Sequence, residues 1–416
     1  LIVENASAML IALPISELTP GMFVDSVTKQ HEGLNSIKIK TSGLVRNQAI
    51  IKRLVTEGVL ELLIDFTKGD AAIPDKYKPK SAPSQKSTTS SSKTKPPAVK
   101  SAITLEQEFA KASINFEQHN RKLQALYGDV TTGLSVNLKV IDEMANDIVS
   151  SVFRNTSAMT ILTRIKDKHS YNWRHMINCA IFTAVFAKYL GYKEEAVQQL
   201  AMGALLHDLG QAKLPQGIIS RPSKLTSSEM DIIKRHVAQG LGLVKGEKGI
   251  TPLILDMIVN HHERLDGSGY PRGITAEKLS RPARMMAIVD VYDALTADRP
   301  HQEGDEPINA LRYLLANKEL FDAELVQHFI KCLGVHPVGT IVKLTNERLA
   351  LVLEGNKTNP IKPKVKLFYN AKHGHHVTPK DLDLNEPDQS IKIVSSIKPL
   401  DYQINLARLL KEHLLN

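Results

Sequence analysis

The hydrophobic pattern of residues 103–336 is helical almost throughout. Apolar residues recur three and four positions apart, and the alternating pattern of strands is almost absent. We therefore predict an all-α domain in this part of the chain. Its expected helices cover residues 105–127, 134–153, 173–190, 193–207, 227–243, 251–262, 284–297 and 308–316.

The segment that precedes this helical domain has a different pattern. Residues 11–70 combine short strand-like runs at 22–24 and 59–66 with an amphipathic helix over 46–57, which predicts a small α+β module. Residues 71–102 are mostly Pro, Ser, Thr and Lys and bury too little apolar area to offset their ordering entropy. We predict a flexible linker there.

The end of the chain, residues 337–416, again favours strands. Two alternating apolar runs about a turn, in GTIVKLTNERLALVLEGN, predict a β-hairpin. Further strands are expected at 364–369 and 390–395, and an amphipathic helix at 406–415. We expect KHGHH at 372–376 to form a solvated polar loop. The predicted fold class is thus α+β multidomain, with an all-α centre, a small N-terminal module and a β-rich C-terminal appendage.

Composition narrows the class of protein. Hydrophobic residues make up 42% and charged residues 23%, as in soluble globular proteins. Two cysteines far apart, with no CxxC, argue against a disulfide or thiolate zinc site and favour a reducing cytoplasm. The net charge of +9 with only 5% aromatic residues does not indicate a long nucleic-acid partner. Neither an apolar run of about 18 residues nor a signal-peptide pattern is evident, so we predict a cytoplasmic protein without membrane spans.

One stretch, HHERLDGSGYP at residues 261–271, places two histidines side by side. Successive residues of a helix point about 100° apart, so one apolar face cannot easily bury both imidazoles. A metal ion between them is the usual reason to gather several imidazoles. A single pair is weak evidence, and the rest of the site has to come from elsewhere in the chain.

Further polar residues interrupt the apolar helices. A lone helical histidine is more often structural than a ligand, but an unpaired buried carboxylate costs several kcal/mol. A metal would satisfy the carboxylates and the imidazoles together. The candidate ligands are His175, His207, Asp208, His236, His261, His262 and Asp290.

The types of these ligands indicate the chemistry. Imidazole and carboxylate without thiolate suit iron, manganese, zinc or nickel better than a purely hard magnesium or calcium site. Seven ligands are too many for one four-coordinate ion with room for a substrate. They suffice for two ions about 3.5–4 Å apart, bridged by a carboxylate such as Asp208. Such a pair hydrolyses phosphate esters.

The order of these motifs resembles a known family. His207-Asp208, then HHERLDGSGYP, then DVYDALTADRP resemble the HD-GYP family of metal-dependent phosphodiesterases, over residues 134–333. LELLIDFTKGD is similar to the end of the small domain that often precedes HD-GYP domains. The resemblance implies an HD-type helical catalytic domain over 103–336. It also implies hydrolysis of cyclic di-GMP to linear pGpG, with GMP as a further product.

The resemblance also implies roles for individual residues. Two divalent ions are implied, with iron or manganese expected. One ion would take His175, His207, Asp208 and Asp290, and the other would share Asp208 and take His236, His261 and His262. The implied catalytic residues are Asp208, Arg299, Gln211 and Lys213, and the implied substrate-binding residues are Arg299, Tyr270, Gly269 and Asp266.

Some positions depart from the family pattern. Gln211 stands where members commonly have a lysine, and Lys213 follows two residues later, so the charge that faces the phosphate is reduced. Tyr171 replaces the glutamate that binds a third metal in some members, which favours two metals. His301 and Gln302 also differ from the usual residues.

Three functions remain open at this point. Besides cyclic di-GMP, the substrate could be the hybrid cyclic GMP-AMP, because sequence cannot place the contacts that distinguish guanine from adenine. The third hypothesis is a weakly active cyclic dinucleotide sensor or interaction module. It is supported by Gln211, which stands where family members commonly have a lysine. GGDEF-type signalling proteins and a second copy of the chain are the candidate macromolecular partners.

Overall fold

A computed structural model describes most of the chain. The described residues are 2–5, 8–30, 42–56, 58–66, 103–165, 171–219, 221, 225–298, 303–356 and 358–414. The chain divides into two compact units, Leu1–Pro96 and Pro97–Asn416.

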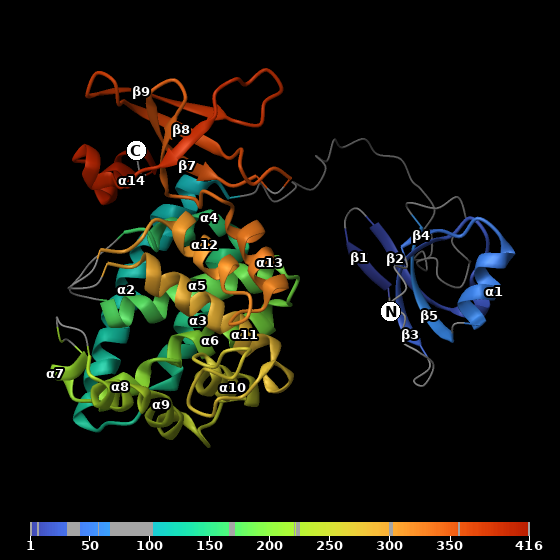
Figure 1. The fold of residues 1–416 in the computed structure, drawn as a ribbon, viewed down its shortest axis with the longest axis horizontal. Coiled ribbons are helices and arrows are strands. Elements are labelled where there is room, and N and C mark those ends of the chain that lie inside the picture. The colour runs from blue at the N-terminus through green and yellow to red at the C-terminus, as the bar shows by residue number, and fades with distance from the viewer. Residues whose placement is uncertain are drawn as a thin grey trace, which may run out of the picture. The chain divides into compact units, whose positions relative to one another are not determined.

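The first unit is an antiparallel sheet with one helix. Its five strands lie in the order β1-β2-β5-β3-β4, drawn in blue in Figure 1. Their bounds are β1 Ile2–Asn5, β2 Ala8–Pro14, β3 Phe23–Gln30, β4 Gly43–Leu44 and β5 Val59–Asp65. Helix α1, Gln48–Thr56, buries Ile51 and Leu54 in one core with Leu62 and Ile64 of β5. The predicted helix and strands of this module are confirmed.

The second unit contains the predicted helical domain. Its elements are α2 Leu105–Thr132, α3 Leu138–Arg154, α4 Thr156–Leu162, α5 Tyr171–Tyr189, α6 Glu194–Leu206, η4 Leu209–Lys213, α7 Gln216–Ile219, α8 Ser227–Lys234, α9 His236–Val244, α10 Pro252–Asn260, α11 Arg281–Thr296, α12 Pro307–Ala316 and α13 Ala323–Leu333. Helix α5 runs through the middle, against α3, α6 and α11 (Figure 1). Every residue from 174 to 187 is buried, so its polar side chains must face one another or a ligand.

Tertiary packing changes some of the predicted boundaries. The helix expected over 227–243 is two helices, α8 and α9, which meet at Arg235. Helix α9 packs directly on η4, where a Cβ added to Gly210 would lie 2.4 Å from the backbone nitrogen of Gly240. This close backbone approach fixes the position of α9. Helices α4 and α13 were not predicted.

The C-terminal region forms a second antiparallel sheet, in the order β10-β6-β7-β8-β9. The strands are β6 Ile341–Leu344, β7 Arg348–Glu354, β8 Lys364–Asn370, β9 His375–Asp383 and β10 Ile393–Ser396. The hairpin of β6 and β7 is confirmed. The polar-loop prediction is wrong for His375 and His376, which pair with Asn370 and Tyr369 at the start of β9.

This C-terminal region shares its core with the helices. Leu351 and Phe368 of the sheet belong to the same buried cluster as the helical domain, and so do Leu409 and Leu410 of α14, Leu406–Leu414. Helix α14 also lies against α2. The α+β multidomain fold class is therefore confirmed, with the β-rich region packed onto the helical centre.

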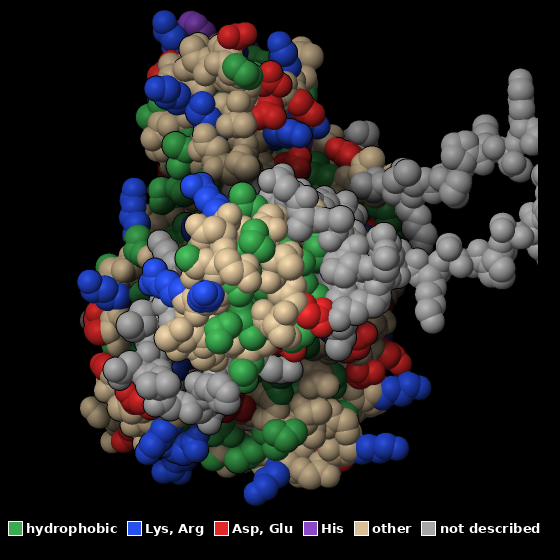
Figure 2. Space-filling model, turned by 90° about the vertical axis from the view of Figure 1, so that its right-hand side faces the viewer, with side chains coloured by type: hydrophobic (Ala, Val, Ile, Leu, Met, Phe, Trp, Pro, Cys, Tyr) green, Lys and Arg blue, Asp and Glu red, His purple; other side chains and the backbone are tan. Residues whose placement is uncertain are grey.

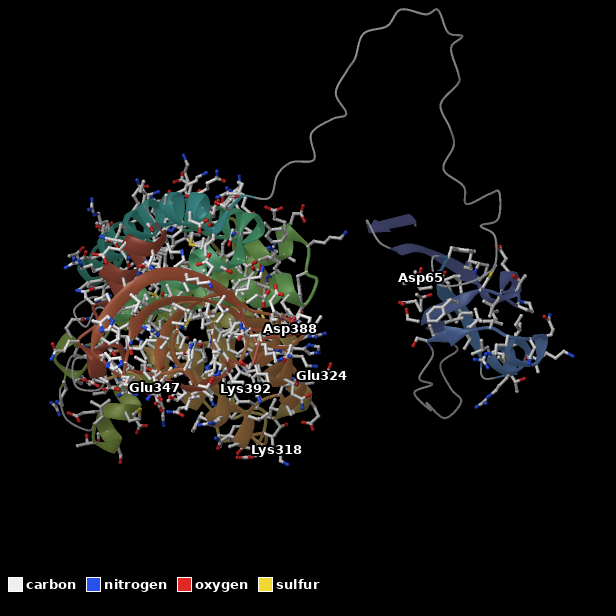
Figure 3. All side chains as sticks on the ribbon, turned by 90° about the horizontal axis from the view of Figure 1, so that it is seen from above. Asp65, Lys318, Glu324, Glu347, Asp388 and Lys392 are labelled. Carbon is white, nitrogen blue, oxygen red and sulfur yellow. The ribbon has the colours of Figure 1, made fainter. Side chains whose placement is uncertain are left out.

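Charged side chains cover the outside of this unit. On the face in Figure 2, basic and acidic side chains are interspersed over the coloured surface. Lys318, Glu324 and Lys392 are exposed examples, labelled in Figure 3. None of the described helices is long and apolar enough to cross a membrane.

Candidate metal centre

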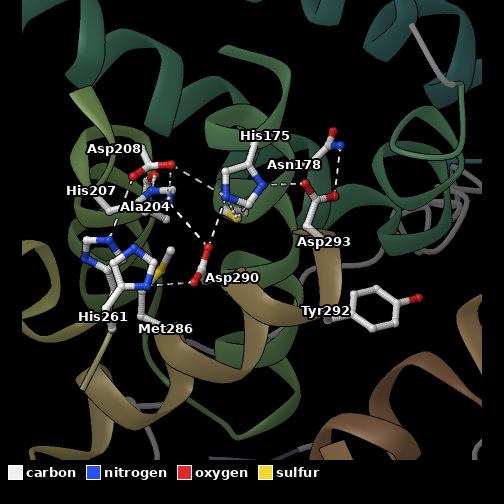
Figure 4. A network of polar contacts seen from close by, with 12 residues as sticks. His175, Asn178, Ala204, His207, Asp208, His261, Met286, Asp290, Tyr292 and Asp293 are labelled. Atoms are coloured by element: carbon white, nitrogen blue, oxygen red, sulfur yellow. Dashed lines mark hydrogen bonds and ion pairs between the residues drawn. The ribbon is translucent and has the colours of Figure 1, made fainter. Parts of the chain in front are cut away.

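Five helical segments bring the candidate ligands together. His175 lies in α5, Asp290 in α11, and His236 begins α9. The pairs His207-Asp208 and His261-His262 directly follow the ends of α6 and α10. All seven residues converge on one site, much of which Figure 4 shows. The grouping expected from the sequence is therefore present in space.

The orientation of three imidazoles is set by nearby backbone carbonyl groups. Nδ1 of His207, of His236 and of His261 lies 2.7, 2.7 and 2.8 Å from the backbone carbonyl three residues earlier. A carbonyl oxygen can only accept a hydrogen bond, so each Nδ1 carries the proton. Each Nε2 therefore presents a lone pair to the centre, as a metal ligand does.

His175 is held by a carboxylate instead. Its Nδ1 lies 2.7 Å from Oδ2 of Asp293, whose Oδ1 accepts a hydrogen bond of 3.0 Å from the Asn178 amide. The opposite nitrogen, Nε2, lies 3.0 Å from Oδ1 of Asp290. Sequence reasoning did not place Asp293 in the site. Asp293 lies one helical turn after Asp290 and therefore on the same face of the helix, and this spacing could have indicated that it belongs to the site.

The carboxylate of Asp208 lies between two groups of imidazoles. Its Oδ2 is 3.6 Å from Nε2 of His207 and 3.8 Å from Nε2 of His175. Its Oδ1 is 3.2 Å from Nε2 of His236 and 3.8 Å from Nε2 of His261. The two oxygens thus face opposite ways, which is the arrangement that a bridging ligand requires.

Asp290 completes the connection between these groups. Its Oδ1 faces His175, and its Oδ2 is 3.6 Å from Nδ1 of His262. The potential ligand atoms of His175, Cys179, His207 and Asp290 lie within 4.8 Å of one another, as do those of Asp208, His236, His261 and His262. Two neighbouring sets of ligand atoms are therefore present.

Several atoms of the centre lack the partners that buried polar atoms need. Nε2 of His207 and Oδ1 of Asp208 are buried without a hydrogen-bond partner. Nε2 of His236 and Nε2 of His261 are only 3.2 Å apart, although both present lone pairs. Unpaired buried acceptors are costly, and two facing lone pairs repel. Divalent cations would remove both problems, so the residues present fit a dinuclear metal site.

Burial also sets the protonation state that metal binding requires. It lowers the pKa of His207 and of His261, and it lowers the pKa of His262 from 6.5 to about 4. At neutral pH these imidazoles are therefore neutral and have a lone pair to donate.

Cys179 lies near this centre, but its chemistry differs from that of the seven residues. Its Sγ is 3.7 Å from Nδ1 of His175. Burial raises the pKa of the thiol to about 12, so it stays protonated at neutral pH. The sulfur is nearly equidistant from both nitrogens of the ring, 3.7 Å from Nδ1 and 3.8 Å from Nε2, so Cys179 packs against the His175 imidazole.

The loop after the two histidines folds back over them. A Cβ on Gly269 would lie 2.5 Å from backbone atoms of residues 262–264, so only glycine fits there. The Tyr270 ring consequently lies 4.6 Å from the His262 ring, at an angle of 32°. The Tyr270 side chain therefore forms the edge of the site.

Glu263 fastens this loop and was missed by sequence reasoning. It is buried, and its carboxylate accepts hydrogen bonds from the backbone nitrogens of Arg272 and Ile274, at 2.8 and 3.1 Å. An acidic residue in a polar loop gives no sequence signal for such a role. Only the folded loop shows that its carboxylate is enclosed.

The remaining predicted site residues lie at the margin or beyond the described residues. Asp266 is exposed, and its Oδ1 accepts a hydrogen bond from the backbone nitrogen of Ser268 at 2.9 Å. Gln211 is half-buried in η4, and Lys213 is exposed at its end. Arg299, His301 and Gln302 lie outside the described residues, as does the side chain of Tyr171.

Comparisons with known proteins agree with this geometry. The family described as an HD domain matches residues 141–325, a domain of unknown function matches 10–141, and a KOW domain associated with HD domains matches 341–405. The cyclic di-GMP phosphodiesterase PA4108 of Pseudomonas aeruginosa is 30% identical over 93% of this chain and 92% of its own. These matches and the helical site define an HD-domain phosphohydrolase.

Two further relatives match a little over a third of this chain. The cyclic di-GMP phosphodiesterase response regulator RpfG of Xanthomonas campestris is 40% identical over 35% of this chain and 39% of its own. The 3'3'-cGAMP-specific phosphodiesterase 1 of Vibrio cholerae is 35% identical over 38% of this chain and 37% of its own. The chain belongs to the HD-GYP family of cyclic dinucleotide phosphodiesterases. The predicted family and enzyme class are confirmed.

Proposed function

We propose that this enzyme hydrolyses cyclic di-GMP to linear pGpG, with GMP as a further product. The support is the Pseudomonas relative, which is named for cyclic di-GMP and aligns with nearly the whole chain, including the regions before and after the catalytic domain. The observation that most directly supports metal-dependent hydrolysis of a phosphodiester is that Asp208 lies between two sets of imidazoles.

Two divalent ions, with iron or manganese expected, are proposed as cofactors. One would be held by His175, His207, Asp208 and Asp290, and the other by Asp208, His236, His261 and His262. The support is that the two carboxylates each face both sets of imidazoles. Such a pair supplies an activated water and polarises the phosphate oxygens.

The protein's own residues then position the substrate and the ligands. Asp293 keeps the His175 ring in one tautomer. Burial raises the pKa of Tyr270, so its hydroxyl stays protonated and can donate a hydrogen bond at the edge of the site. Proposed substrate-binding residues are Gly269, Tyr270, Asp266 and Arg299, and proposed catalytic residues are Asp208, Arg299, Gln211 and Lys213.

Cyclic GMP-AMP is the second candidate substrate. The support is the Vibrio cholerae relative, a 3'3'-cGAMP-specific phosphodiesterase that is 35% identical over 162 residues. Both cyclic dinucleotides have the same phosphodiester linkage, and only one base differs. The metal centre would act on either of them.

Chromatography of the products tests the proposal. Protein purified without oxygen is incubated with each cyclic dinucleotide in turn, and the linear and mononucleotide products are quantified. We expect faster turnover of cyclic di-GMP, and faster turnover of cyclic GMP-AMP would favour the second candidate. Asp208→Ala should abolish hydrolysis of both, whereas Asp129→Ala, at an exposed position of α2, should not. Binding of nucleotide without any product would favour the sensor function.

A further inference from the structure

A lysine that the sequence patterns do not single out lies beside the metal centre. Lys234 ends α8, two residues before His236. Its Nζ lies 5.6 Å from the centre of the Tyr270 ring, which is within the range of a cation–π contact. The same Tyr270 ring lies against that of His262. An ammonium group, an aromatic ring and a candidate metal ligand are therefore neighbours.

This group lies on the open side of the centre. The side chain of His262 is 19% exposed, compared with 11% for Asp208 and 7% for Asp290. The other four imidazoles are exposed by 3% or less. A substrate that reaches the metal centre must therefore approach along His262, where Tyr270 and Lys234 lie.

The two arginines of the adjacent loop have other partners. Arg264 donates hydrogen bonds to the carbonyl oxygens of His261 and Glu263, at 3.2 and 2.9 Å, and its guanidinium lies over Phe321. Arg272 donates to Oδ1 of Asn260 at 2.7 Å. Both guanidinium groups thus stabilise the loop itself.

Lys234, in contrast, has a weak ion pair. Its Nζ is 3.4 Å from Oδ1 of Asp231, one turn earlier, and the two side chains are 42% and 69% exposed. Exposed pairs of this kind contribute little to stability and exchange readily. A phosphate could therefore take the place of Asp231 at little cost.

A cyclic dinucleotide carries two phosphodiesters on opposite sides of one macrocycle. The metal centre can act on only one of them at a time, and the other remains an anion outside the centre. We propose that Lys234 binds this second, non-scissile phosphate at the edge formed by Tyr270. The inference rests on the proposed metal centre but not on the identity of the bases, because both candidate substrates have two phosphates.

The test compares substrates that have one and two phosphates. Lys234→Met keeps the length of the side chain and removes the charge. For the cyclic dinucleotide we expect KM to rise about tenfold, with kcat nearly unchanged, because a partly exposed charge-assisted contact is lost. Hydrolysis of bis(p-nitrophenyl) phosphate, which has a single phosphate, should stay at the wild-type rate.

Three matched variants complete the experiment. Lys234→Arg should restore most of the affinity, and Lys245→Met, at an exposed position after α9, should leave KM unchanged. Asp231→Asn should not raise KM, since it removes the competing carboxylate. Calorimetric titration with a phosphorothioate cyclic dinucleotide that resists hydrolysis should show the same loss of affinity in Lys234→Met.

Two results would overturn the inference. An unchanged KM and affinity in Lys234→Met would show that the ammonium does not contact the nucleotide. An equal loss on both substrates would show that Lys234 supports the metal-bound phosphate or the Tyr270 loop instead. If wild-type protein prefers cyclic GMP-AMP, the proposed substrate fails, but the comparison can be repeated with that nucleotide.

Discussion

Oδ2 of Asp293 lies 2.7 Å from Nδ1 of His175, on the side of the ring opposite Asp290. This contact holds the Nδ1 proton and leaves Nε2 to face the metal centre. Carboxylates that orient a histidine ligand in this way raise its basicity and fix its tautomer. Asp293 therefore acts on the metal centre through His175.

Replacing Asp293 by Asn should weaken metal binding. The amide keeps the size of the side chain but lacks the charge that stabilises the Nδ1–H donor, and loss of such outer partners lowers metal affinity about 10–100-fold. Competition titration with a chelator measures this affinity. Asp129→Asn on exposed α2 is the control, and equal affinity in all three proteins would contradict the assigned role.

Gly269→Ala should reduce activity without removing the metals. The added Cβ would lie 2.5 Å from the backbone of residues 262–264, so the loop that carries Tyr270 has to move. We expect kcat/KM to fall about tenfold or more, since misplacement by about 1 Å is costly in catalysis. Gly242→Ala in α9 is the matched control, because its Cβ would meet no atom within 4 Å. Equal activity of the two variants would be inconsistent with this packing.

Cys179 should be inert and dispensable for metal binding. Its pKa of about 12 leaves almost no thiolate at neutral pH, and the side chain is fully buried. We expect no alkylation of this residue by iodoacetamide in the folded protein at about pH 8, as followed by mass spectrometry. Cys179→Ala should retain the wild-type metal content. Loss of one ion per chain in that variant would identify the thiolate as a ligand.

His119 should contribute to the pH dependence of stability. Burial lowers its pKa below 6.5, although Asp147 opposes this, so the folded state binds the proton less readily than the unfolded state does. The unfolding free energy therefore falls as the pH drops below 6.5. Between about pH 7.5 and about pH 5.5, the thermal midpoint of His119→Leu should fall less than that of the wild type. An equal decrease would show that His119 does not titrate in this way.

Much of the site could be predicted from the sequence alone because its ligands are polar residues that interrupt apolar segments. Asp208 directly follows a largely apolar helix, and Asp290 lies within another, where a buried carboxylate requires a counter-charge. Asp293 violated the same pattern and was overlooked, because its partner His175 is distant in sequence and adjacent only in the fold. Lys234 gave no signal at all, since a lysine at the end of a helix is ordinary.

For the fold as well, local sequence predicts some elements, whereas others depend on contacts between distant parts of the chain. Long, largely apolar runs were sufficient to predict α5 and α6, whose ends lie within two residues of the expected bounds. The break between α8 and α9 depends on the close approach of Gly210 to Gly240, which no local pattern encodes. Pairing with β8 likewise places His375 and His376 in a strand, although their surroundings are polar.

The most direct measurement is the metal content of anaerobically purified protein, with turnover of cyclic di-GMP measured on the same samples. The wild type should contain two ions per chain and produce pGpG. Asp208→Ala should lose metal and turnover together while its circular dichroism stays that of the folded protein, because Asp208 faces both sets of imidazoles. Full metal content or wild-type turnover in that variant would contradict the bridging role of Asp208 and the dinuclear centre built on it.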